Sequence, residues 1–235
     1  MSEQLEFGLV ARDAQLALPL RVRASGATAP TFASPSLDAG FRLLEAWPCW
    51  PSPLVVLTGP PGSGKTHLAR TWAEAAGAER LTGTDLIELD PNAFAGANVW
   101  IDNADVALGG ERPGASQRGL FHLANALRAT GGHALLVSRA APEAWGLELA
   151  DLFSRVRGAT RVEIGRPDDD LLRLVAFQRM AERQIAVRPE IVEALLVRVE
   201  RSLVAVCETI DALDQAALRE GRPVDRRAVA RFFAG

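Results

Sequence analysis

The sequence lacks the features that mark secreted, membrane-spanning and disulfide-linked proteins. It has no apolar run of about eighteen residues, which a transmembrane helix requires, and its first ten residues include two glutamates and no basic segment ahead of an apolar core. Only two of the 235 residues are cysteines, Cys49 and Cys207, and they lie far apart and outside any C-x-x-C pair. We therefore expect free, buried or partly buried thiols in a cytoplasmic protein without membrane contact.

Metal-binding and strongly basic patterns are scarce as well. The three histidines, His67, His122 and His133, are not spaced as zinc ligands, so no structural zinc site is expected. The formal net charge is −3, and no compact run of lysine and arginine occurs. Because proteins that mainly bind nucleic-acid backbones usually carry a basic surplus, we expect any contact with DNA to be weak or indirect.

What the sequence does contain is an alternation of buried strands and helices. Apolar runs without polar alternation are typical of strands buried on both faces of a parallel sheet. Such runs occur at 54–58, 99–102 and 134–138, with a shorter edge strand at 161–164 and helical patterns at 65–76 and 117–130. The alternation predicts an α/β fold with a parallel central sheet flanked by helices.

The two ends of the chain differ from this core, which we place at 31–166. Residues 1–30 are predicted to form a flexible N-terminal arm, because they end in a small, polar, proline-terminated stretch typical of linkers. After Pro167 the pattern becomes helical, beginning with three aspartates ahead of an amphipathic segment, so 167–235 predicts a small all-helical lid. Within the core, the glycine-containing stretch 107–117 is interpreted as a mobile loop of unassigned role.

The strongest motif is a phosphate-binding loop between the strand at 54–58 and the helix that follows it. Residues 59–66 read G-P-P-G-S-G-K-T and match G-x-x-x-x-G-K-[ST] in full. The glycines let backbone N–H groups turn onto phosphate oxygens, and the helix N-terminus adds partial positive charge. We expect Lys65 to contact the β- and γ-phosphates and the Thr66 hydroxyl to bind Mg²⁺. The predicted nucleotide-binding residues are Gly59, Pro60, Pro61, Gly62, Ser63, Gly64, Lys65, Thr66, His67, Ser138 and Arg201.

Asp102 closes the second buried strand, where an aspartate either holds Mg²⁺ through water or simply caps the strand. The next residue is Asn103, at a position where many P-loop ATPases carry an acid that activates the attacking water. An amide cannot accept that proton, so we predict slow hydrolysis by the isolated protein. The N-K-x-D pattern of guanine recognition is absent, which favours ADP or ATP as the ligand.

Three other polar residues each have two possible roles. Ser138 ends the third buried strand, where it either contacts the γ-phosphate or is an ordinary strand-end serine. Arg201, at the head of a C-terminal helix, either reaches the phosphates or is a solvated surface arginine. Arg155, just before the edge strand, either enters a neighbouring subunit's nucleotide site, where such an arginine raises the rate by about 10³–10⁵, or forms a surface salt bridge worth less than about 1 kcal/mol.

Taken together, the motifs resemble those of the DnaA-related AAA+ proteins, and most closely the Hda family, over nearly the whole chain. The similarity rests on the phosphate loop, the Walker B segment 99–105 with its unusual asparagine, the sensor 1 strand and turn 135–142, the Box VII segment 149–156, the sensor 2 segment 199–203 and the closing stretch 210–214. The resemblance implies that Arg155 is an arginine finger acting in trans and that Arg201 is the sensor 2 arginine. It also implies self-association through AAA+ interfaces.

The N-terminal arm contains a further match, the segment Q-L-A-L-P-L at 15–20. It is similar to sliding-clamp-binding peptides of the Q-L-x-L-P-L type, in which an extended segment places Leu18 and Leu20 in an apolar pocket and the Gln15 amide at its rim. Read without the resemblance, the same segment suits an edge strand of the core. The predicted clamp-binding residues are Gln15, Leu16, Leu18, Pro19 and Leu20.

The resemblance implies a negative regulator of DNA replication initiation. The nucleotide-bound protein would dock on the DNA-loaded sliding clamp, the β subunit of DNA polymerase III, and present Arg155 to the ATP held by the initiator DnaA. Hydrolysis of that ATP would lower the amount of active initiator. Two alternatives stay open: a helicase loader or DNA-remodelling ATPase with turnover of its own, and a non-catalytic adaptor that uses nucleotide only to set its shape.

Overall fold

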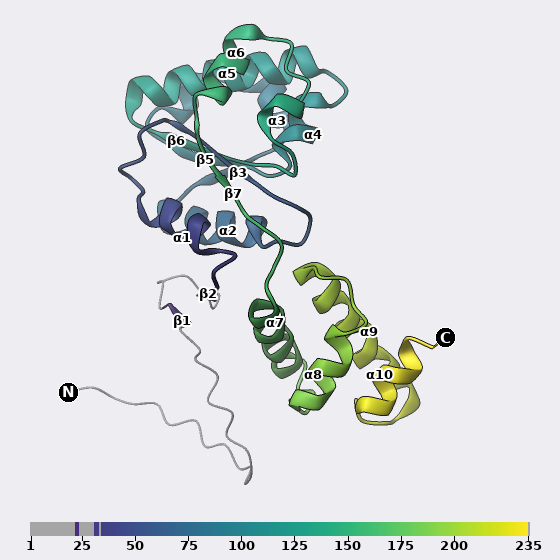
Figure 1. Ribbon diagram of the computed structural model, residues 1–235. Coiled ribbons are helices and arrows are strands. Elements are labelled where there is room, and N and C mark those ends of the chain that lie inside the picture. Colours follow the sequence, from purple (N-terminus) through teal and green to yellow (C-terminus); the bar gives the residue numbers. More distant parts are fainter. Residues whose placement is uncertain (1–21, 24–30, 33, 235) are drawn as a thin grey trace, which may run out of the picture.

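The computed structural model describes residues 22–23, 31–32 and 34–234 (Figure 1). Two short strands, β1 (Val22–Arg23) and β2 (Thr31–Phe32), pair antiparallel ahead of the core in the sequence. The predicted clamp-binding segment, 15–20, lies outside the described residues.

A five-stranded parallel sheet forms the centre of the core. Its strands are β3 (Leu54–Thr58), β4 (Glu79–Leu81), β5 (Asn98–Ile101), β6 (His133–Val137) and β7 (Thr160–Glu163), in the order β4-β5-β6-β3-β7. Because β3 lies between two strands and under helices on both faces, Val55, Val56 and Leu57 are fully buried, which explains the uninterrupted apolar run. The predicted parallel sheet is confirmed, with β7 at one edge.

Helices cover both faces of this sheet. They are α1 (Asp38–Glu45), α2 (Lys65–Ala76), α3 (Gly83–Glu88), α4 (Ala104–Gly109), α5 (Pro113–Thr130) and α6 (Ala150–Arg157), with 3₁₀ turns at Pro91–Phe94 and Pro142–Ala144. Figure 1 shows α1 and α2 on one face of the sheet and α3, α4, α5 and α6 on the other. A separate cluster of buried side chains joins each group of helices to its face. On α2, Leu68 and Trp72 are buried four residues apart, so a single stripe faces the sheet.

The C-terminal helices form a subdomain with a core of its own. They are α7 (Asp169–Glu182), α8 (Pro189–Leu196), α9 (Leu203–Glu220) and α10 (Arg226–Phe232), and they share a third cluster of buried side chains. Side-chain oxygens of Asp168, Ser202 and Asp225 accept backbone N–H groups at the starts of α7, α9 and α10. The Arg179 guanidinium joins α7 to α9 by donating to both carboxylate oxygens of Asp211, at 2.8 and 2.6 Å.

Two expectations from the sequence are wrong. The stretch 107–117 is not a long loop, because α4 continues to Gly109 and α5 begins at Pro113, a residue well suited to the first turn of a helix. Cys49 is exposed rather than buried, whereas Cys207 is partly buried as expected, and both thiols are free. Of the helices that the structure describes, none combines the length and hydrophobicity needed to cross a membrane.

Candidate nucleotide-binding site

The phosphate loop connects the carboxyl end of β3 to the first residue of α2, as the motif predicts. Its three glycines, Gly59, Gly62 and Gly64, have positive φ angles of 150°, 68° and 96°. A Cβ atom on Gly59 would lie 2.2 Å from the carbonyl oxygen of Ile164, so the loop also needs the absence of a side chain there. The glycines therefore set the backbone path that turns the loop back toward α2.

Lys65 is held inside this loop. Its side chain is almost fully buried, and Nζ donates to the carbonyl oxygen of Pro60 at 2.7 Å and to Oγ of Ser63 at 3.3 Å. Burial lowers the pKa of Lys65, and the nearby Asp102 carboxylate partly offsets this effect. An anion in the loop would further favour the charged ammonium, so the site is electrostatically suited to phosphate.

Thr66 and Asp102 meet although 36 residues separate them. Thr66 Oγ1 lies 3.3 Å from both carboxylate oxygens of Asp102 and donates to them. Asn103 donates its backbone N–H to Asp102 Oδ1 at 3.1 Å and adopts a left-handed conformation with φ 51°. A hydroxyl and a carboxylate on adjacent elements are the hard oxygen donors that Mg²⁺ prefers, so these two residues fit the predicted metal site.

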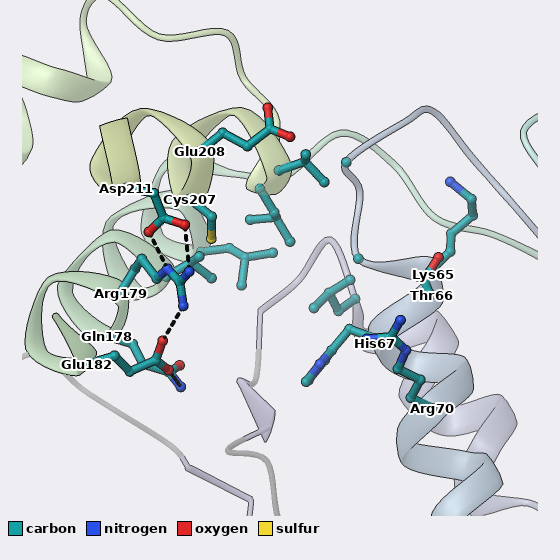
Figure 2. Close-up of a pocket in the computed structure, with 17 residues that line it drawn as sticks. Lys65, Thr66, His67, Arg70, Gln178, Arg179, Glu182, Cys207, Glu208 and Asp211 are labelled. Carbon is teal, nitrogen blue, oxygen red and sulfur yellow. Dashed lines mark hydrogen bonds and ion pairs between the residues drawn. The ribbon is translucent and has the colours of Figure 1, made fainter. Parts of the chain in front are cut away.

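A cavity of about 690 Å³ extends from the phosphate loop to the helical subdomain. Side chains of α2 face it from one side and those of α7 and α9 from the other (Figure 2). The subdomain also contacts the loop directly, because the backbone N–H of Leu203 donates to the carbonyl oxygen of Gly62 at 2.9 Å. A Cβ atom on Gly62 would lie 1.8 Å from Ser202 Oγ, so the start of α9 packs tightly against the loop.

The cavity brings together residues that sequence reasoning did not select. Apolar residues lining it include Leu37, Leu171, Val175, Leu203 and Val204, and polar ones include Gln178, Arg179, Glu182, Glu208 and Asp211. The matches of 199–203 and 210–214 to family motifs pointed toward this wall, through Leu203 and Asp211. His67, which was predicted, also lines the cavity, and its Nε2 is buried without a hydrogen-bond partner. Burial lowers the pKa of His67, which favours the neutral imidazole.

Ser138 and Arg201 are engaged elsewhere. Ser138 is buried next to β3, and its backbone N–H donates to the carbonyl oxygen of Leu57 in that strand. Its hydroxyl donates to the carbonyl oxygen of Ala140 at 2.8 Å. Arg201 is half exposed and pairs with Asp169 rather than facing the phosphate loop. Its guanidinium also donates to the carbonyl oxygen of Pro167 at 3.3 Å, and Arg201 does not line the cavity.

Arg155 lies away from this site, in the last turn of α6. It lines a smaller recess with Ser52, Pro53 and Leu54, which lead into the amino end of β3, whereas the phosphate loop leaves the carboxyl end. Five residues of strand separate the two ends by roughly 16 Å. The structure therefore places Arg155 near the amino ends of the strands and the phosphate loop of the same chain at their carboxyl ends.

Comparisons with known proteins agree with this architecture. Neither a family model nor a curated protein matches the sequence. Domain III of the Thermotoga maritima replication initiation protein DnaA matches with a TM-score of 0.71 and 17% identity, over 84% of this chain and 90% of that one. DnaA bound to AMPPCP and single-stranded DNA matches with a TM-score of 0.63 and 18% identity, over 80% of this chain. A mutant of T. maritima RuvB matches with a TM-score of 0.62 and 15% identity, over 82%.

These similarities establish the fold alone, because all three identities are low. This chain has the AAA+ fold of the DnaA type, with a phosphate loop in the position that the fold requires. It spans 66% of the length of the second and third of these proteins. The activities of the whole relatives therefore enter only as proposals.

Proposed function

We propose that the protein is a nucleotide-dependent regulator of replication initiation, of the kind that the Hda resemblance implies. In this proposal it binds ADP or ATP in the 690 Å³ cavity and presents Arg155 to the ATP of a second AAA+ subunit, the initiator DnaA. The similarity in fold to DnaA supports the pairing, because AAA+ nucleotide sites are completed by a neighbour of similar shape.

Several contacts support nucleotide binding in the cavity. The buried Lys65 lies within the loop, and Thr66 and Asp102 are arranged to hold Mg²⁺ beside it. A bound Mg²⁺ would offset the charge of the phosphates. One related structure, DnaA, is bound to the ATP analogue AMPPCP, and the same kind of ligand is proposed here.

The position of Arg155 is the observation that carries the proposal. The side chain lies near the amino end of β3, whereas its own phosphate loop follows the carboxyl end, and this separation supports a role at the nucleotide of another subunit. A guanidinium that stabilises the charge of the departing phosphoryl group raises the rate by about 10³–10⁵. The partner is DnaA in this proposal, and a second copy of this chain offers the same kind of site.

Hydrolysis by the protein itself is expected to be slow. Asn103 follows Asp102 where an activating carboxylate is common, and an amide does not accept a proton from water. The bound nucleotide then serves chiefly to bridge the phosphate loop and the helical subdomain, which already contact each other directly through Leu203 and Gly62. This distinguishes a regulator from a self-sufficient DNA-remodelling ATPase.

Docking on the sliding clamp through 15–20 is the second half of the proposal. It rests on the sequence match alone, because the segment lies outside the described residues. Replacing both Leu18 and Leu20 by alanine should abolish retention on immobilised clamp and leave the melting temperature unchanged. Unchanged retention of the double variant would remove this part of the proposal.

The main experiment measures hydrolysis of DnaA-bound ATP in the presence of DNA-loaded clamp. Wild-type protein should stimulate it, and Arg155→Ala should lose at least about 10³-fold of the stimulation. Arg157→Ala is the matched control, because Arg157 lies in the same last turn of α6 but outside the recess. No stimulation by wild type would refute the regulatory function, and full stimulation by Arg155→Ala would favour the nucleotide-dependent adaptor.

A further inference from the structure

The recess that contains Arg155 holds a second arginine, Arg128, near the end of α5. Its volume is about 250 Å³, and its other lining residues are small or apolar: Ser52, Pro53, Leu54, Ala124, Ser154 and Gly158. No carboxylate is among the described residues that line it. Two arginines therefore line one hollow beside the amino end of β3, and none of the described residues lining it supplies a counter-charge.

Neither arginine has an ion-pair partner in the part of the chain that the structure describes. The Arg155 guanidinium lies over the ring of Phe121. By contrast, Arg179 and Arg183 of the helical subdomain are paired with acids. Two arginines without an ion-pair partner among the described residues, lining one hollow, are suited to bind an anion with several oxygens.

Phosphate suits this recess, because a guanidinium group binds its oxygens in pairs, as it does those of a carboxylate, and a polyphosphate carries enough negative charge for both arginines. The hollow is too small for a duplex, and the net charge of −3 with no basic run disfavours nucleic acid. Ser154 and Gly158, which also line the recess, are small and leave room for a ligand beside the arginines. A compact polyphosphate is therefore the kind of ligand that suits the recess.

We propose that Arg128 is a second phosphate-binding arginine, which acts with Arg155 on the triphosphate of a nucleotide held by a P-loop partner subunit. This inference rests on the proposed function for its ligand, but the pairing of the two arginines does not depend on it. Arg155 contacts the phosphoryl group that is transferred, and Arg128, on the neighbouring helix, binds oxygens of the same triphosphate. The alternative role of both arginines is to interact with the C-terminal dipoles of α5 and α6, a smaller effect on stability alone.

The first test is independent of any partner. Inorganic tripolyphosphate, with Mg²⁺ in excess, is titrated calorimetrically into the full chain whose own site is saturated with ADP. Arg128→Ala and Arg155→Ala should each weaken binding about tenfold or more, since each removes charge-assisted hydrogen bonds. Arg157→Ala should bind as wild type does. Wild-type affinity in Arg128→Ala would overturn the inference.

The second test distinguishes a partner's nucleotide from free phosphate as the ligand. In the DnaA-bound ATP assay, Arg128→Ala should lower the stimulated rate about tenfold or more, with its own affinity for ADP unchanged. A wild-type rate in that variant would overturn the assignment to a partner's nucleotide. If wild type itself gives no stimulation, both the proposed function and the assignment to a partner's nucleotide are refuted. The tripolyphosphate titration still decides whether the recess binds phosphate.

The variant Arg128→Lys distinguishes a structural role of Arg128 from a role in phosphate binding. Lysine keeps the positive charge at the end of α5 but lacks the planar fork, so this variant should melt as wild type does and recover only part of the tripolyphosphate affinity and of the rate. Full recovery of both by lysine would show that charge at the helix end suffices and would overturn the proposal of a two-arginine phosphate receptor.

Discussion

The guanidinium of Arg155 lies over the ring of Phe121, with 4.9 Å between Cζ and the ring centroid. Because Phe121 belongs to α5 and Arg155 to α6, the contact fixes the arginine relative to the edge of the sheet. We predict that Phe121→Ala lowers the stimulated hydrolysis rate about two- to fivefold, since a partly exposed cation–π contact contributes about 0.5–1 kcal/mol. The assay is hydrolysis of DnaA-bound ATP at saturating protein.

The conservative variant distinguishes positioning from general stability. Phe121→Tyr keeps the ring under the guanidinium and should retain the wild-type rate. If Phe121→Ala and wild type stimulate equally at saturation, Phe121 does not position Arg155, whatever the two melting temperatures are.

The contact between Gly62 and the start of α9 predicts a strong effect of adding one carbon atom. Gly62→Ala should weaken ADP binding about tenfold or more, because the new Cβ would lie 1.8 Å from Ser202 Oγ and would push the helical subdomain off the loop. Gly221→Ala is the matched control: its φ of 63° is similar, but no atom lies within 4 Å of its added Cβ. Equal weakening in both variants, measured calorimetrically, would show that backbone strain rather than the contact with Ser202 is responsible.

The ion pair between Arg201 and Asp169 predicts a gain of affinity when it is removed. If Arg201 contacts bound ATP, it must first leave Asp169, so Asp169→Ala should raise ATP affinity by up to about fivefold, the value of an exposed ion pair. Arg201→Ala should abolish this gain. An unchanged ATP affinity in Asp169→Ala would indicate that Arg201 stays with the helical subdomain when nucleotide binds.

Two partly buried histidines predict a loss of stability in mild acid. Burial lowers the pKa of both His67 and His133 from 6.5, so the unfolded state binds more protons below about pH 7. The free energy of unfolding should therefore fall as the pH drops through 6.5 toward the lower folded pKa values. His67→Gln should reduce this slope in denaturant titrations between about pH 7.5 and 5.5 without ligand. An unchanged slope would assign the effect to other groups.

Those parts of the site that depend on local sequence could be predicted. The phosphate loop was identified because glycine, lysine and threonine occur at fixed offsets between a buried strand and a helix. The meeting of Thr66 and Asp102 agrees with the Mg²⁺ role predicted for each, and it arises because both follow the carboxyl ends of parallel strands, β3 and β5, in one sheet.

Other features depend on tertiary packing that no local pattern encodes. The strand β4 was missed because only Leu81 of its three residues is buried, so it has no apolar run. The error at 107–117 arose from reading glycines as loop signals, although Gly114 lies within α5. The partners of Arg201 and Arg155, Asp169 and Phe121, are 32 and 34 residues away in sequence, which shows why motif matching did not place these side chains.

The claim that Arg155 serves a site on another subunit is tested most directly by the affinity of Arg155→Ala for ADP, measured calorimetrically on the full chain. The geometry predicts the wild-type dissociation constant, because Arg155 lies near the amino end of β3 and the phosphate loop follows its carboxyl end. Lys65→Ala, which removes the buried ammonium of the loop, should lose ADP binding and shows that the assay responds. A tenfold weaker affinity in Arg155→Ala would contradict the claim, because the arginine would then act on the nucleotide of its own chain.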